Sequence, residues 1–448
     1  MSRSPGCRSI KILLVNVHSS WNAGDHLLTE EAVRLLEAQF PGASFTLAMD
    51  DPSSYSGPRT VLPSFTAWVH PTDKERGTHP WRWLAFPALV WHALMAVIGC
   101  RLTGRPWYLG APPLRRALLE AYFEADMVVS TAGGFLVTSG FVGISFVLAL
   151  FTIYYGVMAG RPVYLLPQSL GPIRRKREAF LLKQVLSRTR MVLIRDAVSM
   201  EVWREWRVPR VRAYLVPDLA LGRPPETCRA EALALLQSHG AGEKQGRPWL
   251  GVTLMNWGTI NRAFLRQDEY EEAVAAAIRD LVTRSGGQAF LFVQVHGPSF
   301  GQDDAVPARR VQQRLADLGD RVVLVGQWVA PTVLRAAYGE MDLFLGTRLH
   351  SNLFALTEGV PVVAIGYQYK TRGIMRMLGL EEYVVEIDSI AAEALVPLVR
   401  RAWSKNRELR AHIAPELQRL REETAQAGTL IAQDYRRVRQ AAEPGGEL

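Results

Sequence analysis

An arginine and a histidine stand two residues apart in the segment 346–350 (GTRLH), which follows the apolar run Leu343–Leu345 and opens a helix-length stretch. At a helix start, a guanidinium, an imidazole and unbonded backbone amides surround one point. Such a point suits an anionic substrate that requires proton transfer. The pattern therefore predicts that Arg348 and Leu349 bind substrate and that His350 is catalytic. The alternative for His350 is a structural histidine.

Two further cations follow predicted strands. Lys370 comes after Val360–Ile365 and is predicted to lie at the same end of the sheet as segment 346–350. Arg195 follows an earlier apolar run, where an arginine can hold a carboxylate or a phosphate with two parallel hydrogen bonds. Both are predicted to bind substrate. The alternative for Arg195 is a local ion pair with Asp196 or Asp218.

The motif Asn22-Ala23-Gly24-Asp25 lies between the apolar run Ile12–Val17 and an amphipathic stretch. Free N–H groups at a helix start attract anions, and glycine allows close approach to the backbone. Asn22 and Gly24 are therefore predicted to bind substrate, and Asp25 is a second catalytic candidate. The alternative is that Asp25 only caps the helix.

Two loops in the first half of the chain carry small or polar residues after predicted strands. Gly133 and Gly134 come after Met127–Ser130, and Gln168 comes after Val163–Leu166. Loops at the carboxyl ends of parallel strands bind ligands in open α/β sheets, although paired glycines also form ordinary turns. These three residues complete the predicted substrate-binding set.

The elements that position these residues alternate between short β-branched runs and helix-length segments, in two series. This alternation is typical of parallel α/β units. It predicts two Rossmann-like domains that face each other across a cleft. We expect an N-terminal domain over residues 1–222 and a C-terminal domain over 245–448 that ends in two charged helices, separated by a polar connection.

One hydrophobic insert, at about 81–108, interrupts the first series. Its apolar stretch 84–100 is near the lower limit for a membrane-spanning helix, and tryptophans and arginines flank it as they flank interfacial helices. The alternative is a buried core helix. A second apolar stretch, 141–159, falls where a crossover helix is expected and is predicted to be core.

Composition restricts the class of protein further. The chain of 448 residues carries 52 Lys and Arg against 43 Asp and Glu, a net charge of +9, which favours anionic partners. Its three cysteines share no short spacing, so a disulfide scaffold and a thiolate zinc site are disfavoured. A signal-peptide core, a Walker A loop, GxGxxG, HExxH and a nucleophile elbow are absent from the sequence. We expect an unsecreted protein without nucleic-acid-binding function.

The order of the motifs resembles the polysaccharide pyruvyl transferase family. The matching elements are Asn22-x-Gly24-Asp25, Gly133-Gly134, Gln168-Ser169-x-Gly171-Pro172, Arg195-Asp196-x-x-Ser199, Pro217-Asp218, Arg348-Leu349-His350, Gly359-Val360-Pro361 and Tyr369-Lys370. The first loop, 17–21, and the stretch 50–120 depart from the family pattern, and both concern acceptor recognition.

The resemblance implies a fold like that of the GT-B glycosyltransferases. It also implies transfer of a pyruvyl group from phosphoenolpyruvate to sugar hydroxyls of a glycan or lipid-linked glycan precursor, commonly as a ketal, in exopolysaccharide and cell-envelope biosynthesis. In this scheme Arg195 and Arg348 hold the phosphate and carboxylate of the donor. His350 is the general acid, Asp25 orients or deprotonates the acceptor, and Lys370 stabilises the departing phosphate.

The same scheme requires neither a metal nor an organic cofactor. If the acceptor is lipid-linked, the insert and the basic surface would hold a cytoplasmic enzyme on the inner face of an anionic membrane. A second interpretation keeps the fold and changes the donor to a nucleotide sugar. That interpretation needs an acidic residue for the ribose hydroxyls, and the run after Gly366 offers none.

Overall fold

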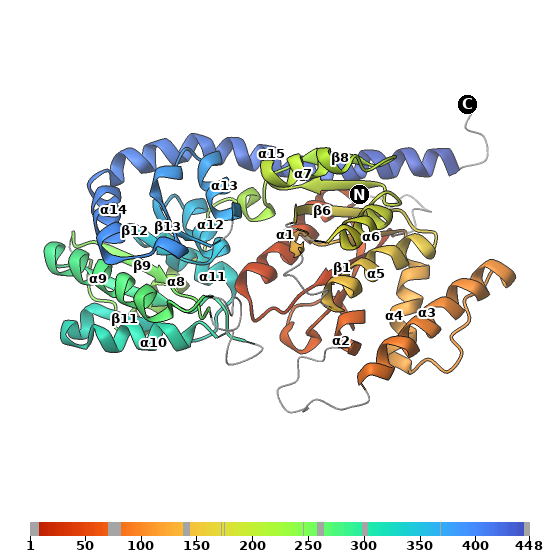
Figure 1. Ribbon diagram of the computed structural model, residues 1–448, viewed down its shortest axis with the longest axis horizontal. Helices are drawn as coiled ribbons and strands as arrows, with labels where there is room; N and C mark the ends of the chain where they lie inside the picture. Colours follow the sequence, from red (N-terminus) through yellow and green to blue (C-terminus); the bar gives the residue numbers. More distant parts are fainter. Residues whose placement is uncertain are drawn as a thin grey trace, which may run out of the picture. The chain divides into compact units, whose positions relative to one another are not determined.

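The computed structural model describes residues 9–69, 82–137, 144–171, 173, 175–244, 246–257, 264–297, 303–367 and 369–442. Of the sequence motifs, Pro172 and Gln368 lie outside these residues, and so does Trp81 of the insert. The chain forms two compact units (Figure 1). The first contains residues 1–20, 28–219 and 423–448, and the second contains 21–27 and 220–422. The sequence predicted two continuous domains, 1–222 and 245–448. In the structure, residues 21–27 group with the second unit and residues 423–448 group with the first.

The first unit is built on a parallel sheet of eight strands. Its strands are β1 (Lys11–Val17), β2 (Ser44–Met49), β3 (Thr60–Pro63), β4 (Met127–Ser130), β5 (Gly133–Leu136), β6 (Val163–Leu170), β7 (Met191–Ile194) and β8 (Arg212–Leu215). Their order is β3-β2-β1-β4-β6-β7-β8, and β5 pairs with β6. The strand order reverses beside β1, where α/β proteins commonly bind ligands.

Helices connect these strands and bury apolar faces on the sheet. They are α1 (Ala23–Gln39), α2 (Phe65–Val69), α3 (Arg82–Thr103), α4 (Pro113–Glu124), α5 (Ile144–Met158), α6 (Lys176–Leu186) and α7 (Ala197–Trp206). Every residue of β4 and β7 is buried, as expected for parallel strands covered on both faces. Residues 141–143 of the stretch predicted as a crossover helix lie outside the described residues, and nearly all of the rest forms α5, whose buried residues such as Leu148 and Ile153 lie in the core.

The second unit has a parallel sheet of six strands in the order β11-β10-β9-β12-β13-β14. These strands are β9 (Trp249–Thr253), β10 (Gln288–Phe292), β11 (Val322–Val325), β12 (Leu343–Gly346), β13 (Val362–Gly366) and β14 (Val384–Glu386). Helices α9 (Gln267–Ser285), α10 (Ala305–Arg314) and α14 (Ala392–Ser404) pack together, and α8 (Arg229–Ser238), α11 (Pro331–Gly339) and α12 (Leu349–Thr357) form another group (Figure 1). The remaining helices are α13 (Tyr369–Met377) and α15 (Asn406–Ala442).

The long helix α15 contributes residues to both units, because the division falls at Glu423. Its last part belongs to the first unit, where Asp434 accepts hydrogen bonds from Tyr164 and Arg190, each at 3.0 Å. In the same unit Tyr435 packs edge-on against Phe40 at 5.6 Å between ring centroids. The C-terminal stretch therefore completes the core of the unit that the N-terminal half builds.

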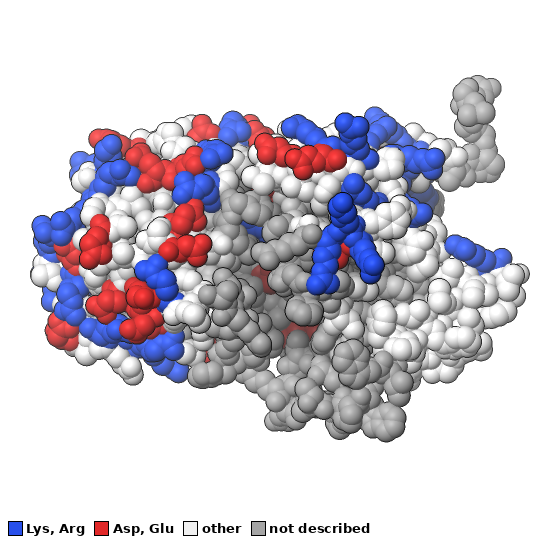
Figure 2. Space-filling view, in the orientation of Figure 1, with Lys and Arg blue, Asp and Glu red and all other residues white. Residues whose placement is uncertain are grey.

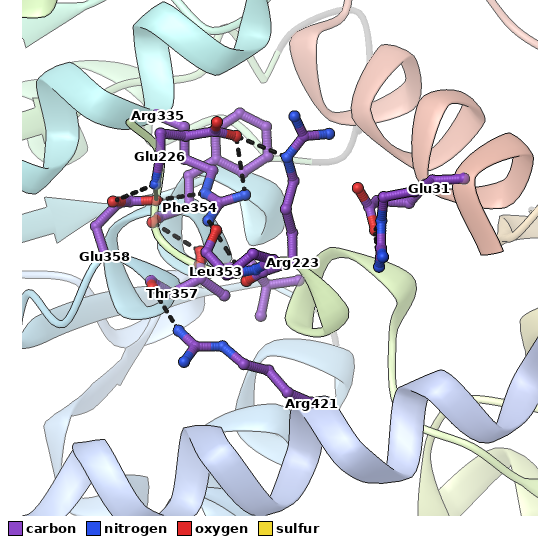
Figure 3. Close-up of polar contacts among 11 residues, drawn as sticks. Glu31, Arg223, Glu226, Arg335, Leu353, Phe354, Thr357, Glu358 and Arg421 are labelled. Carbon is purple, nitrogen blue, oxygen red and sulfur yellow. Dashed lines mark hydrogen bonds and ion pairs between the residues drawn. The ribbon is translucent and has the colours of Figure 1, made fainter. Parts of the chain in front are cut away.

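A buried ion network fixes the polar connection at 223–226 to the second unit (Figure 3). Arg335, on α11, is fully buried, and it bonds Glu358 at 2.6 Å and Glu226 at 3.2 Å. It also donates to the carbonyl of Pro224, and Arg223 pairs with Glu226 at 2.7 Å. The segment that the sequence predicts to be a linker thus begins as an anchored part of the second unit.

Candidate active site at the carboxyl ends of the strands

Segment 346–350 lies at the junction of β12 and α12, beside the point where the strand order of the second sheet reverses. The residue before α12 is Arg348, with extended backbone, and His350 is in the first turn. The hydroxyls of Thr253 and Ser351 are 2.7 Å apart, which links the end of β9 to the start of α12. The predicted helix start is confirmed, and it lies at the usual ligand-binding edge of such a sheet.

The guanidinium of Arg348 forms a two-point ion pair with Asp304. The Nε–Oδ2 and Nη2–Oδ1 distances are 2.7 and 2.6 Å. Asp304 is fully buried and also accepts the amide of Val295 at 3.1 Å. Burial raises the pKa of Asp304 to about 6, although the guanidinium acts in the opposite direction. The orientation of Arg348 is therefore set by a carboxylate that is 44 residues away in the sequence.

The motif Asn22-Ala23-Gly24-Asp25 belongs to the second unit although it opens α1. Asn22 forms an isolated antiparallel bridge with Val295, directly after β10. The amide of Ala23 donates to the carbonyl of Gln294 at 3.3 Å. These contacts place the N-terminal motif among the residues that follow the strands of the second sheet.

Within this motif, the side chain of Asn22 caps α1 and bonds to Asp25. The side-chain oxygen of Asn22 accepts the amide of Gly24 at 3.0 Å, and its Nδ2 donates to the carboxylate of Asp25 at 2.9 Å. Capping of the helix thus falls to the asparagine. Asp25 is only partly buried and lies in the first turn.

The backbone of Gly24 lies against the imidazole of His350. A Cβ atom at position 24 would be 2.4 Å from Nδ1 and 2.6 Å from Cγ of that ring, so a larger residue at this position must displace the ring. The structure therefore brings together Asn22, Gly24, Asp25 and His350 from two helix starts.

Lys370 lies in the first turn of α13, which begins at Tyr369 directly after the loop that ends β13. Its residue exposure is only 6%. The neighbouring Tyr367 packs edge-on against Trp257, with ring centroids 4.8 Å apart. The lysine thus follows the strand next to β12, and it is largely buried.

Gly133, Gly134 and Gln168 belong to the first unit and lie at the paired strands β5 and β6. Gly133 is in register with Gln168, and the side-chain amide of Gln168 donates to the carbonyl of Thr131. The glycines thus lie in a short strand rather than in an open loop, and their small size lets the β5 chain run beside β6.

Arg195 is the cation of a buried network in the first unit. It is 4% exposed, and it bonds Asp218 and Ser169, each at 2.6 Å. The hydroxyl of Ser169 donates to Asp196 at 2.8 Å, and Asp196 also accepts the amide of Ser199 at 2.8 Å and caps α7. The structure therefore contains the local ion pair with Asp218 that was the alternative for this arginine.

Sequence reasoning missed several polar residues at the same edges. Asp304 was visible only as one of two adjacent acids, and nothing local linked it to Arg348. At the end of β1, Asn16 has a φ of 56° and donates to Ser130 at 3.0 Å, and His18 pairs with Asp50 at 2.8 Å. The only local indication was that polar residues directly follow a buried strand.

Among the residues that the structure describes, no group of three or more His, Cys, Asp or Glu side chains could hold a metal ion. The geometry instead provides hydrogen-bond donors, a paired arginine, an imidazole and a buried lysine on the second unit. These groups can bind an anion and move a proton.

The model of the polysaccharide pyruvyl transferase family matches residues 22–369. This chain belongs to that family. The match begins at Asn22 and extends past His350, and Lys370 is the residue immediately beyond its end. The resemblance inferred from the order of the motifs is thereby confirmed.

This pyruvyl transferase has a curated relative, the amylovoran biosynthesis protein AmsJ of Erwinia amylovora. The two are 23% identical over 415 residues, which cover 90% of this chain and 95% of the relative. The pair therefore matches along nearly the whole of both chains.

Solved structures with a similar fold include two that match nearly the whole of this chain. Sucrose-phosphate synthase from Thermosynechococcus elongatus has a TM-score of 0.55 at 15% identity and covers 97% of this chain and 100% of its own. Anabaena Alr3699/HepE, solved with UDP and glucose, has a TM-score of 0.55 at 12% identity. The match covers 95% of this chain and 99% of the Anabaena chain. At these identities the likeness shows the fold, which is that of GT-B glycosyltransferases with two Rossmann-like domains.

Proposed function

We propose that this protein transfers a pyruvyl group from phosphoenolpyruvate to two hydroxyls of a sugar in a glycan or lipid-linked glycan precursor, forming a ketal. The family membership supports a pyruvyl transferase. The observation that supports the chemistry is the packing of Gly24 against His350, next to the helix start that follows Arg348. An imidazole, a guanidinium and helix-terminal amides are the groups that an anionic enol phosphate requires.

The reaction needs a proton on the methylene carbon of the donor and a new bond at C2. In our proposal the His350 imidazolium gives its proton to the methylene carbon while the first sugar hydroxyl attacks C2 and gives its proton to Asp25. The C2–O bond to phosphate then breaks, and inorganic phosphate leaves with the electron pair. The second hydroxyl attacks the resulting oxocarbenium carbon and gives its proton to the neutral His350, which restores the imidazolium, and the proton held by Asp25 leaves with the phosphate. The ketal and phosphate account for all the atoms of the donor and acceptor.

The charged groups have separate roles in this scheme. Arg348, held by Asp304, binds the carboxylate or phosphate of the donor, and Lys370 stabilises the departing phosphate. Asp25 orients or deprotonates the acceptor hydroxyl. Arg195, which bonds Asp218 and Ser169, keeps its proposed role in donor binding. The scheme requires no metal or organic cofactor.

We further propose that the acceptor is carried on a lipid, which places the enzyme in the cytoplasm at the inner face of a membrane. A basic protein with a net charge of +9 is attracted to an anionic leaflet.

The decisive experiment measures phosphate release from phosphoenolpyruvate with a panel of sugars and lipid-linked saccharides. We expect release that depends on the acceptor and is lost in His350→Ala and Arg348→Ala. Matched controls are His239→Ala, at the end of α8, and Arg400→Ala, in a surface pair with Asp280 at 2.5 Å. Both controls should keep the activity.

Running the reaction in D2O tests the proton step. A ketal made by this route carries one deuterium in its methyl group, which mass spectrometry detects. A product that retains a vinyl CH2 is an enolpyruvyl ether and would overturn the ketal. Release of UDP from a UDP-sugar, together with no phosphate release from phosphoenolpyruvate, would show that the proposed donor is wrong and would favour a glycosyltransferase. For that alternative donor, Glu386 lies beside Gly366, but it is already paired with Arg372 at 2.8 Å.

A further inference from the structure

Helix α3, in the hydrophobic insert of the first unit, exposes an apolar face. The exposed side chains are Trp91 at 55%, Leu94 at 39%, Ile98 at 38% and Leu102 at 71%. They are spaced three or four residues apart, so they lie in one row along the helix. A surface helix of a globular protein normally presents polar or charged residues on its outer face. This row therefore requires a partner other than water.

The opposite face of α3 is part of the core. Leu89, Ala93 and Ala96 are fully buried and belong to the same hydrophobic cluster as Phe65 of α2. The helix is thus held on the body of the unit with the exposed row facing outward. By length and composition Ala85–Thr103 could cross a bilayer, and it is the one helix in the described part of the chain that could. A crossing would remove Leu89 and its neighbours from the core, so the packing favours a helix that lies flat.

The chain from α3 into the first half of α4 carries charge of one sign, and acidic residues begin at Glu120, which pairs with Arg116. Residues 76–119 contain no Asp or Glu and include six arginines. Two of these, Arg101 and Arg105, are exposed at the end of the apolar row. Figure 2 shows the surface over α3 and α4 as uncharged apart from basic side chains, with no acidic residue in view there. An apolar row that ends in exposed arginines is complementary to acyl chains beneath anionic headgroups.

We propose that the exposed row of α3 is a docking surface for an anionic lipid bilayer. The helix lies in the headgroup region parallel to the membrane, its apolar side chains contact the acyl chains, and Arg101 and Arg105 bind lipid phosphates. The proposal rests on the membrane location proposed above, which it assigns to particular residues. It does not depend on the pyruvyl donor.

The test is flotation of the full-length protein with vesicles in the absence of substrate. We expect binding to vesicles of mixed phosphatidylcholine and phosphatidylglycerol, and weaker binding when salt is raised. The variant Leu94→Gln/Ile98→Gln should lower the vesicle partition coefficient by about tenfold. The variant Arg101→Gln/Arg105→Gln should reduce binding to the anionic vesicles while leaving the weak binding to phosphatidylcholine vesicles unchanged.

The matched control is Phe180→Gln/Leu181→Gln, on α6. These two side chains are also exposed, at 60% and 47%, and they follow a basic stretch. The control variant should bind vesicles like the wild type. If the control loses binding as much as the α3 variant does, the effect is general and the assignment to α3 is wrong.

Three further results would overturn the proposal. They are failure of the wild type to bind anionic vesicles, binding of the α3 variant equal to that of the wild type, and a dimer in sedimentation that the α3 variant converts to a monomer. The last would show that a second copy covers the row. If circular dichroism shows that the double variant is misfolded, the single variant Leu102→Gln decides, because that side chain is 71% exposed. Vesicle binding without phosphate release would remove the proposed reaction and leave this surface intact.

Discussion

Gly24 and His350 are 326 positions apart in the chain, yet a Cβ on Gly24 would be only 2.4 Å from Nδ1 of the histidine. The contact joins the first turn of α1 to the first turn of α12. Any side chain at position 24 must therefore displace the imidazole.

We predict that Gly24→Ala lowers kcat for phosphate release by about 100-fold, because an imidazole moved by about 1 Å no longer reaches the reacting atoms. The melting temperature should change little, since Asn22 still caps the helix. The control is Gly242→Ala, where a Cβ would meet no atom within 4 Å. Full activity of Gly24→Ala would show that the position of His350 is not critical.

The ion pair between Arg348 and Asp304 leads to a prediction about pH. Because the folded-state pKa of about 6 lies above the ordinary aspartate value of about 3.9, the folded protein binds this proton more tightly than the unfolded chain. The contribution of Asp304 to stability is therefore largest below this window and decreases as the pH rises through it. We expect the difference in unfolding free energy, wild type minus Asp304→Asn, to fall between about pH 4 and about pH 6.

Chemical denaturation of both proteins at a series of pH values measures that difference. A difference that rises with pH would mean that the attraction of Arg348 outweighs burial and that the folded-state pKa lies below the unfolded one. The same variant should lose phosphate release at all pH values, because Arg348 would then lack the carboxylate that orients it.

Arg195 is predicted to be more important for stability than an exposed arginine. Replacing it by alanine leaves the buried carboxylate of Asp218 without its cation, which should lower the free energy of unfolding by about 3 kcal/mol. Replacing the exposed arginine Arg400, which is paired with Asp280, by alanine should cost much less, because water screens the pair. Equal losses in urea denaturation would contradict the buried network as the main role of Arg195.

The ion network of Arg335 tests whether its charge or its shape stabilises the second unit. Arg335→Met alone should lower the unfolding free energy by about 3 to 5 kcal/mol, because Glu226 and Glu358 lose their shared cation. The triple variant Glu226→Gln/Arg335→Met/Glu358→Gln should recover much of that loss, since no uncompensated charge remains. A triple variant as unstable as the single one would show that the shape of Arg335, rather than its charge, holds residues 223–226.

Much of the fold could be predicted from local sequence. The run Met127–Ser130 matches β4 residue for residue, and the runs Ile12–Val17 and Leu343–Leu345 are each one residue shorter than β1 and β12. The elements β3 and α4 were missed, because the stretch 50–120 has no regular alternation and β3 has only four residues and ends at Pro63. Periodicity reports which face of an element is buried, and short irregular strands provide too few residues for a period.

The candidate site divides in the same way. The sequence by itself determined which polar residues follow strands and open helices, because these positions depend on local propensity and on the chain direction in parallel sheets. Only the tertiary structure decided that Asp304 holds Arg348, that Asp218 holds Arg195 and that the start of α1 belongs to the second unit. The partner of a buried charge is chosen by the path of the chain in space, and the need to neutralise that charge leaves no local pattern in the sequence.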